Sequence, residues 1–582
     1  MKIKKENLAI ILVLLIALIL RFWRLDLNPV GLVHDEIHQL VNAKSLVLTG
    51  KGAAGTGAGI FQNQPYCDGN CVFGELPTYL LTPFAFLKTS FPWTKTPLIL
   101  TSVLMIFWFI KLFENLTKNK WIGITVGLMI AVNPWAINFG RTAYENVFSY
   151  MFYVWSLYLL TKKPFQLKTQ LIAIFLGLAA SMSYFGAKPI FVPLMLVGLG
   201  YGWWMEKGKN FKKYLILGLI TVGLMAGYGL ILKNSYAGTR LKETNLMKSE
   251  IVNQVNEERR MSLEIPIFRD IFINKYTVLS KILLKKFFFG LAPNYLFNEG
   301  ELGEDHMMIA NHPFMYLIDL PLIILGFYAL SVISIPAMVL IGMIIFILPI
   351  TPTLSNYANT YALRSGLTYP MLAAMAAVGI YFLIKKIKNK KRKFLIGIIL
   401  FMVYLISLIN FLMMYWYRNP FEKSAGWAFF EREAVKYVNL IKENNKEIKI
   451  EITTQDPVDM IYEYAIFSGK INNKDFMVKM NETIRNKNYE IEGIKFSKIC
   501  PTKIETDKIY LMAQNQNCIK EPNNLPRIAE LRDAGTRWVI PNEILCKDIK
   551  LPQYPYPRKI EEFKIENMSR EIFCKTWISQ PL

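Results

Sequence analysis

The chain has 582 residues, of which 53% are hydrophobic and only 19% are charged, and its formal net charge is +23. The hydrophobic residues occur in long blocks, which excludes a disordered or nucleic-acid-tail protein. The blocks also argue against one soluble globular domain, whose apolar residues would recur at the period of a helix or a strand. This net positive charge can be interpreted only once the positions of the basic residues along the chain are known.

Eleven apolar segments are long enough, at about 15–20 residues, to cross a bilayer as helices. In chain order they are about 8–25, 97–113, 121–138, 146–160, 170–186, 189–204, 214–232, 314–333, 335–351, 368–384 and 394–414. The first segment is followed by RFWRLD and not by a small-residue cleavage site, so we predict that it is an uncleaved span. The sequence therefore predicts a polytopic α-helical membrane protein of about eleven spans.

Lys and Arg residues set the predicted orientation, because they are retained on the cytoplasmic side of a membrane. With the N-terminus in the cytoplasm, 19 of them fall in five cytoplasmic pieces: MKIKKE, ENLTKNK, TKKPFQLKT, MEKGKNFKK and KKIKNKKRK. The three short external connections carry one each, namely Arg141, Lys188 and Arg364. This orientation places loops of about 26–96 and 233–313 and the tail 415–582 outside, which predicts a multi-pass protein of the plasma membrane with an extracytoplasmic tail.

The loop 233–313 and the tail carry different patterns. The loop is polar at first and then apolar (KILLKKFFFGL), which predicts interfacial helices lying on the membrane. In the tail, residues 427–443 have the spacing of an amphipathic helix, and residues 447–454 alternate like a strand. We therefore divide the chain into a membrane module, residues 1–414, and a soluble α/β domain, residues 415–582.

All the cysteines fall in predicted external segments: Cys67, Cys71, Cys500, Cys518, Cys546 and Cys574. This distribution suits an oxidising compartment and up to three disulfides. Cys67 and Cys71 are close enough in sequence to pair locally. The other four allow three connectivities, which the sequence leaves open.

The first external loop contains two adjacent acids, Asp35 and Glu36. Neighbouring carboxylates can supply a general base and an orienting or metal-binding partner. The same pair is also typical of a solvated helix start, where acids in the first turn favour the helix dipole. His34 and His38 flank the acids at i,i+4 and are weak candidates for metal ligands on one helical face. Ordinary core or surface positions are the commoner role of such histidines.

Arg141, Lys188 and Arg364 call for an explanation, because basic residues are disfavoured in external connections. A shared anionic ligand at the external membrane face is one such explanation, and a lipid phosphate fits that depth. Glu145 follows Arg141 at i+4 and shares its helical face. The alternative for Arg141 and Lys188 is a basic side chain that snorkels to the interface.

The order of these motifs resembles the membrane-embedded GT-C glycosyltransferases, and within them the branch of protein O-mannosyltransferases and aminoarabinose transferases. The resemblance rests first on the end of the first span and the loop behind it, through Arg21, Leu25, Pro29, Asp35 and Glu36. FGRTAYENVFSY is similar to an Arg-x-Ala-x-acid motif, and SMSYFGAKPIF to a Tyr-x-small-x-basic segment. Glu145 stands where some members have Asp, Lys188 where Arg is expected, and the tail beyond about 425 matches no motif.

The resemblance implies a polyprenyl-phosphate sugar as donor and a hydroxyl on a protein, lipid or glycan as acceptor, with no certain cofactor and a divalent metal left open. Asp35 is then the general base of an inverting transfer, and Glu36 and Glu145 position hydroxyl groups. Arg141, Lys188 and Arg364 are then the donor-phosphate residues. Membrane lipids are expected as partners, and nucleic acid is not.

Two other classes share some of these features. A transporter or flippase of lipid-linked intermediates would have many spans and a cationic cavity, and it predicts inverted repeats and charges at mid-membrane. Asp319 is the main charge inside the predicted spans. A receptor or scaffold that works through its tail would leave the Asp-Glu loop without a purpose.

Overall fold

The computed structural model describes the chain except for residues 1–3, 68–72, 89, 143, 234–248, 264–265, 301–308, 310–311, 356–360, 532–534, 556, 558 and 582. The chain forms two compact units. The first unit comprises Met1–Leu20, Ser102–Phe139 and Phe148–Ile409. The second unit comprises Arg21–Thr101, Gly140–Val147 and Asn410–Leu582. The predicted first external loop therefore belongs to the same compact unit as the tail, although the two segments are far apart in the sequence.

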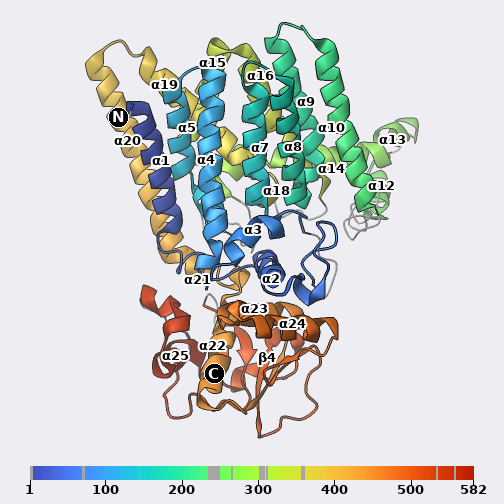
Figure 1. The fold of residues 1–582 in the computed structure, drawn as a ribbon, viewed down its shortest axis with the longest axis vertical. Coiled ribbons are helices and arrows are strands. Elements are labelled where there is room, and N and C mark those ends of the chain that lie inside the picture. The colour runs from blue at the N-terminus through green and yellow to red at the C-terminus, as the bar shows by residue number, and fades with distance from the viewer. Residues whose placement is uncertain are drawn as a thin grey trace. The chain divides into compact units, whose positions relative to one another are not determined.

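The first unit is built from helices (Figure 1). The helices that lie wholly or mainly in it are α1 (Lys5–Phe22), α4 (Thr96–Thr117), α5 (Lys120–Val132), α6 (Pro134–Phe139), α7 (Asn146–Thr161), α8 (Leu167–Ser183), α9 (Lys188–Met205), α10 (Phe211–Leu232), α12 (Ser249–Arg260), α13 (Pro266–Phe272), α14 (Lys275–Phe289), α15 (Asp319–Ile333), α16 (Ile335–Ile347), α17 (Ile350–Leu354), α18 (Tyr361–Arg364), α19 (Thr368–Lys386) and α20 (Lys390–Met413). Every predicted apolar segment coincides with one or two of these helices.

Six helical segments among the described residues are long and apolar enough to cross a membrane. They are Trp93–Thr117, Phe185–Met205, Phe211–Leu232, Ile335–Leu354, Thr368–Lys386 and Lys390–Glu422. Helices α5, α8 and α15 are also apolar but shorter. The helical character of the predicted spans is confirmed, and the number that crosses a membrane stays a prediction.

Small residues let two of these helices pack closely. A Cβ at Gly326 in α15 would lie 1.9 Å from the carbonyl oxygen of Met375 in α19, and a Cβ at Gly379 would lie 2.1 Å from that of Leu322. The backbones therefore touch at a reciprocal pair of glycines, which is how apolar helices gain packing contacts where there is no water to drive them together. A larger side chain at either position would force α15 and α19 apart.

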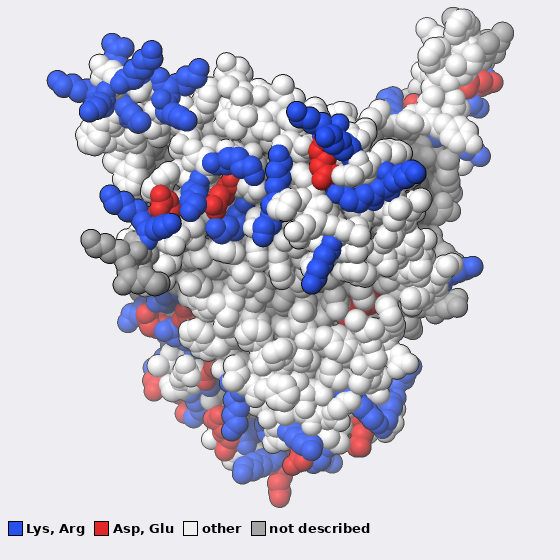
Figure 2. All heavy atoms as spheres, turned by 45° about the horizontal axis from the view of Figure 1, so that its top comes forward, with Lys and Arg blue, Asp and Glu red and all other residues white. Residues whose placement is uncertain are grey.

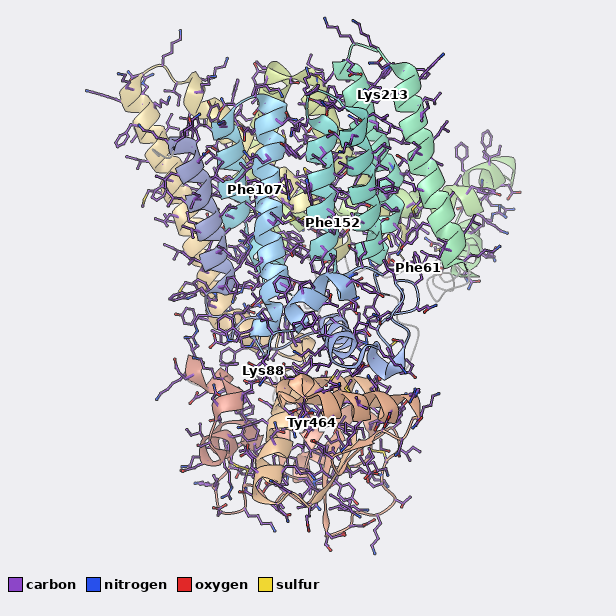
Figure 3. The ribbon with its side chains drawn as sticks, in the orientation of Figure 1. Phe61, Lys88, Phe107, Phe152, Lys213 and Tyr464 are labelled. Atoms are coloured by element: carbon purple, nitrogen blue, oxygen red, sulfur yellow. A yellow bond between two sulfur atoms is a disulfide. The ribbon has the colours of Figure 1, made fainter. Side chains whose placement is uncertain are left out.

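The basic connections gather at one end of the first unit, where α4 meets α5, α7 meets α8, α9 meets α10 and α19 meets α20 (Figure 1). Figure 2 shows Lys and Arg concentrated over this end. Lys213, labelled in Figure 3, pairs with Glu206 at 3.1 Å and donates to the Phe165 carbonyl at 3.0 Å, so it ties two connections together. The clustering fits the predicted orientation, and which end is cytoplasmic stays a prediction.

The second long loop forms the short helices α12, α13 and α14. Val255 of α12 and Val278 of α14 pack together in a small core. Phe268, Phe272 and Phe288 remain more than half exposed. An apolar face of this kind is what an interfacial helix presents to a membrane, so these helices match the predicted pattern, and their contact with lipid stays a prediction.

The second unit holds a mixed sheet covered by helices. Its strands are β1 (Lys449–Thr453), β2 (Glu490–Ile491), β3 (Ile494–Ser497), β4 (Lys508–Ala513), β5 (Arg527–Ala529), β6 (Thr536–Val539) and β7 (Ile578–Ser579). Their order is β2-β3-β1-β4-β6-β5-β7, with β3, β1 and β4 parallel and the remaining pairs antiparallel. Ile450 and Ile452 of β1 are buried, as the alternating pattern predicts.

The helices of the second unit link the first external loop to the sheet. They are α2 (His34–Thr49), α3 (Pro77–Ala85), α21 (Asn419–Glu422), α22 (Phe429–Asn444), α23 (Pro457–Phe467), α24 (Lys474–Arg485) and α25 (Arg570–Trp577). Helix α2 packs against α23 and α24, which contact β3 and β2 in turn (Figure 1). The predicted amphipathic helix (α22), the predicted strand (β1) and a C-terminal α/β fold are confirmed.

Two disulfides close loops around the sheet. They join Cys500 to Cys518 and Cys546 to Cys574, which selects one of the three connectivities that the sequence left open. Cys67 is also disulfide-bonded, and its predicted partner Cys71 lies outside the described residues.

Candidate functional site

The adjacent acids Asp35 and Glu36 lie in the first turn of α2, but their environments differ. Glu36 is fully buried, and its Oε2 accepts a hydrogen bond from the backbone N–H of Val33 at 3.0 Å. A carboxylate that satisfies an orphan N–H at a helix start stabilises the helix. The side chain of Asp35 is 46% exposed. Glu36 therefore fixes the position of the helix start, and Asp35 is the acid of the pair that solvent can reach.

Asp35 contacts His34, which belongs to a cluster with His38 and the distant Asp459. Asp35 Oδ1 lies 3.1 Å from Nδ1 of His34. Nε2 of His34 lies 3.4 Å from Oδ2 of Asp459, and Nε2 of His38 lies 2.6 Å from Oδ1 of the same carboxylate. Asp459 is in the first turn of α23. These contacts connect the start of α2 to the start of α23.

The charges in this cluster favour a protonated His34. Burial lowers the pKa of His34, but the neighbouring carboxylates of Asp35, Asp459 and Asp456 outweigh it and raise the pKa to about 9. Burial and the charge of Asp459 raise the pKa of Asp456 to about 6. In the absence of another cation, the acids of this cluster are therefore balanced by the imidazolium of His34.

Glu145 lies against α2. It is buried, and its Oε2 accepts hydrogen bonds from Nε2 of Gln39 at 2.7 Å and from the backbone N–H of Gly74 at 2.9 Å. Gln39 in turn accepts a hydrogen bond from Thr78 of α3. The structure thus brings Glu145 to the same helix as Asp35 and Glu36, as part of a hydrogen-bond network that joins α2, α3 and the short connection before α7.

Arg141 is fully buried and forms hydrogen bonds to the backbone that follows α1. Its guanidinium makes five hydrogen bonds to carbonyl oxygens, at 2.6–3.0 Å. The acceptors are Arg21, Trp23, Arg24 and Asn28. The guanidinium carbon also lies 5.6 Å from the ring centre of Tyr415. Burial lowers the pKa of Arg141, and the hydroxyl of Tyr415 opposes this shift. These contacts give Arg141 a structural role that its position in the sequence does not reveal.

The other two predicted phosphate-binding cations belong to the first unit. Lys188 is the first residue of α9, where its Nζ donates to the Tyr228 hydroxyl at 2.7 Å and lies over the rings of Phe185 and Tyr228. Arg364 ends the short helix α18 and is half-buried. The side chain of Lys188 is thus held by protein groups.

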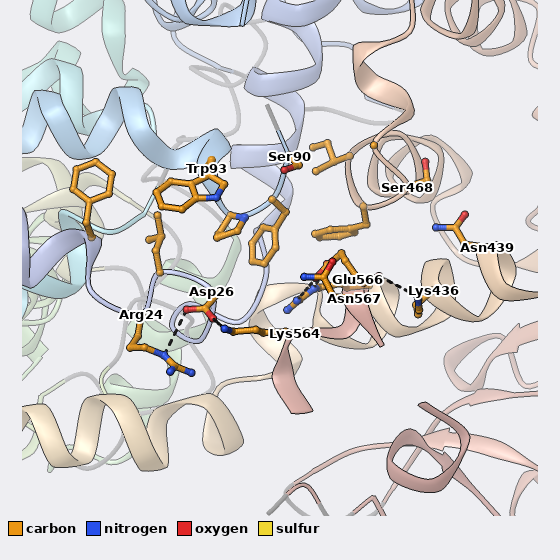
Figure 4. A pocket seen from close by; sticks show the side chains of 18 of the residues that line it. Arg24, Asp26, Ser90, Trp93, Lys436, Asn439, Ser468, Lys564, Glu566 and Asn567 are labelled. Atoms are coloured by element: carbon orange, nitrogen blue, oxygen red, sulfur yellow. Dashed lines mark hydrogen bonds and ion pairs between the residues drawn. The ribbon is translucent and has the colours of Figure 1, made fainter. Parts of the chain in front are cut away.

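A cavity of about 730 Å³ lies in the second unit, between the residues that follow α1 and the α/β fold (Figure 4). Several of its charges are paired within the cavity. Asp26 pairs with Arg24 at 3.6 Å and with Lys564 at 3.4 Å, and Arg432 binds both carboxylate oxygens of Glu566. None of the predicted site residues is among the described residues that line this cavity. The cavity and the start of α2 are therefore lined by different residues.

The sequence did not single out Asp459, Gln39 or Lys95. Asp459 is 421 positions from His38, so no local pattern links the two residues. Lys95 is fully buried, donates to the Gly31 carbonyl at 2.8 Å and interacts electrostatically with Glu36. The one usable signal for Asp459 was its place in the first turn of a helix, residues 457–467, that follows the predicted strand 447–454.

No protein-family model matches the sequence, and no curated protein matches it. Among solved structures, the chain is similar to the archaeal oligosaccharyltransferase AglB from Archaeoglobus fulgidus in complex with an inhibitory peptide and a dolichol-phosphate. The identity is 11% over 96% of this chain and 77% of that chain, with a TM-score of 0.46. It is also similar to ArnT from Cupriavidus metallidurans bound to undecaprenyl phosphate, at 9% identity over 92% of this chain and 97% of that chain, with a TM-score of 0.44.

The match to the apo form of the Archaeoglobus fulgidus oligosaccharyltransferase covers 80% of this chain and 64% of that chain, at 12% identity and a TM-score of 0.42. In this match the chain spans less than two thirds of the length of the oligosaccharyltransferase. Because the TM-scores are below 0.5, we transfer neither residue roles nor an activity from these proteins.

Proposed function

We propose that the chain is a membrane glycosyltransferase that moves a sugar from a polyprenyl-phosphate donor to an acceptor hydroxyl, with Asp35 as the general base. The motif resemblance and the six helices long enough to cross a membrane support this class. The acceptor oxygen forms a bond to the anomeric carbon as the bond from that carbon to the phosphate oxygen breaks. The bonding electron pair leaves with the lipid phosphate, the acceptor proton passes to Asp35, and the anomeric configuration inverts.

The observation that carries this proposal is the contrast within the acid pair. Asp35 is half exposed in the first turn of α2. Its buried neighbour Glu36 accepts a hydrogen bond from the Val33 N–H and so holds the start of that helix in place. A general base must reach a substrate proton from a fixed position, and an accessible carboxylate on a rigid element meets that need. Glu36 and Glu145 are buried in hydrogen bonds, so we propose that they act as positioning residues that hold α2.

The leaving phosphate needs cations that can approach it. Arg141 donates its hydrogen bonds to backbone carbonyls, so we propose that it shapes the loop that carries the catalytic acid. We retain Lys188 and Arg364 as the proposed donor-phosphate residues. Each is the single cation of its predicted external connection, and we propose a lipid phosphate as the ligand of both.

A transfer assay with the full-length protein in liposomes tests the proposal. The donors are undecaprenyl-phosphate hexoses and pentoses with a tritiated sugar, the acceptors are supplied by membranes of the source cell, and the readout is label that leaves the organic-soluble donor. We expect transfer from at least one donor, and a loss of about 10²-fold or more in Asp35→Asn.

Asp26→Asn is the matched control, because it removes the same charge from the same loop at an ion-paired residue. It should retain transfer within about threefold of the wild-type rate, because Asp26 is a partly exposed residue that makes none of the contacts of the proposed site. No transfer from any donor, or equal transfer by Asp35→Asn and the wild type, would exclude the proposed reaction.

The transporter alternative makes a different prediction. Asp319, the acid inside the predicted spans, lies in the first turn of α15. It accepts hydrogen bonds from the Tyr404 hydroxyl at 2.6 Å and from the Tyr316 backbone N–H at 3.0 Å. This pairing is that of a structural acid at a helix start. A flippase would move the labelled lipid between leaflets without separating sugar from phosphate, which the same assay distinguishes.

A further inference from the structure

Three metal-binding side chains from two distant parts of the chain converge beside Asp35. His34 and His38 are one helical turn apart on α2, and their ring centres lie 4.5 Å apart. Asp459 comes from the first turn of α23. One donor atom from each of the three residues lies within 4.8 Å of the others. Two imidazoles and a carboxylate form a common ligand set for zinc and related divalent ions.

The donor atoms also point in suitable directions. The Nε2 atoms of His34 and His38 face the two oxygens of one carboxylate, at 3.4 and 2.6 Å. Ligand atoms of a tetrahedral zinc site lie about 3.3 Å apart, given metal–ligand distances of about 2.0–2.1 Å. A small opening of the shorter contact between His38 and Asp459 would therefore admit an ion.

The second nitrogen of His34 has the partner that a metal-binding histidine requires. Its Nδ1 lies 3.1 Å from Oδ1 of Asp35. A carboxylate that accepts the Nδ1–H of a histidine fixes the tautomer in which Nε2 carries the lone pair, and this arrangement is usual behind metal ligands. With an ion bound, this tautomer would leave the lone pair of Nε2 free to bind it.

A further carboxylate is available near the three donors. Asp456 precedes α23 and interacts electrostatically with Asp459, His34 and His38. Its Oδ1 atom is buried and has no hydrogen-bond partner among the described residues. A buried carboxylate oxygen without a partner is costly, and a cation close to it would offset that cost.

We propose that His34, His38 and Asp459 bind a divalent transition-metal ion of the zinc class, which cross-links the first external loop to the C-terminal α/β fold. The ion would fix α2 against α23, and so would fix the element that carries Asp35. The proposal concerns the stability of this contact and does not depend on the proposed transfer reaction, because zinc binding is measured without any donor or acceptor.

The test uses full-length protein without a purification tag, stripped with EDTA and then exposed to zinc ions alone. Mass spectrometry of the elements after gel filtration gives the zinc content, and amide hydrogen exchange reports the stability of each segment. We expect one zinc per chain. We also expect exchange in α2 and α23 to slow by about tenfold or more, because an ion that binds only the closed contact shifts the opening equilibrium.

Two conservative variants and one control complete the test. His34→Asn and Asp459→Asn change partly exposed side chains and should fold, yet each should lose the bound zinc and the slowed exchange. His312→Asn removes a histidine of the first unit and should keep both. In addition, cobalt bound to the wild type should show the visible spectrum of a tetrahedral site.

Wild-type protein that binds no more zinc than His34→Asn, or zinc that leaves the exchange of α2 and α23 unchanged, would overturn the proposal. A transfer reaction that survives loss of zinc would leave the proposed function intact, and zinc binding by a protein that transfers no sugar would leave the metal site intact.

Discussion

The start of α2 and the connection around Arg141 lie in the same compact unit and were predicted as parts of one site, yet they are built in opposite ways. Asp35 is half exposed and contacts another charged side chain. Arg141 is fully buried and makes five hydrogen bonds to the backbone. The difference shows that a charged residue in a predicted external loop can be held by buried backbone groups or left accessible to solvent, and we propose a role in chemistry only for the accessible one.

The largest effect on stability is expected from Arg141→Gln. This change leaves several buried carbonyls without a donor, and losing a buried charged partner costs about 3–5 kcal/mol. The free energy of unfolding of the second unit, measured by denaturant titration in detergent, should fall by that amount. Arg418→Gln is the control, because Arg418 is an exposed residue paired with Glu422, and it should cost less than about 0.5 kcal/mol.

Arg141→Lys sharpens the same comparison. A lysine keeps the charge but cannot reach four carbonyls with a single ammonium group. If the main role of Arg141 is to hold these backbone carbonyls, the lysine variant should lose nearly as much stability as the glutamine variant. Full stability with a raised donor KM in both variants would instead assign Arg141 to the phosphate.

A smaller effect is expected at Glu145. Glu145→Ala removes the acceptor for Gln39 and Gly74, and it should lower the free energy of unfolding by about 2–3 kcal/mol, since hydrogen bonds to a charged group are worth about 1.5–3 kcal/mol. Glu145→Gln keeps one acceptor oxygen and should lose about half as much. A stable Glu145→Gln variant with abolished transfer would show direct contact with substrate.

The smallest effect is expected away from both regions, at Glu433 of α22. Both of its carboxylate oxygens are buried without a hydrogen-bond partner among the described residues, and burial, assisted by Glu431 and opposed by Arg432, raises its pKa well above the ordinary value. Because the folded-state pKa is raised, ionisation costs stability as the pH rises above about 4.5.

Glu433→Gln removes this cost. It should stabilise the second unit by about 1 kcal/mol at pH 7, and the gain should shrink toward zero as the pH falls to about 4.5. Thermal unfolding of wild type and variant across this pH range provides the measurement. A gain that is independent of pH would mean that Glu433 does not titrate differently in the folded state.

Local patterns account for the parts of the fold that the sequence predicted. Apolar runs marked the helices of the first unit, and the alternation in residues 447–454 marked β1, because each depends on neighbours in the chain. The acid pair was visible for the same reason. Its division into a buried Glu36 and an accessible Asp35 was not visible, since burial depends on how α2 packs on α23 and α24.

The remaining features depend on contacts between residues that are far apart in the chain. Asp459 meets His38 across 421 positions, and no spacing rule joins them. Arg141 was predicted as a phosphate ligand because it is a cation in an external connection. The carbonyls that hold it belong to residues 21–28, and only the folded path of the backbone after α1 brings them around the guanidinium.

The central claim is that Asp35 acts in the chemical step and is not needed to hold the lipid. The most direct test measures undecaprenyl phosphate binding by native mass spectrometry and sugar transfer in liposomes, both on Asp35→Asn and on Asp26→Asn. We predict that both variants bind the lipid phosphate like the wild type, and that only Asp35→Asn loses transfer by about 10²-fold or more. Transfer by Asp35→Asn at the wild-type rate would contradict the claim.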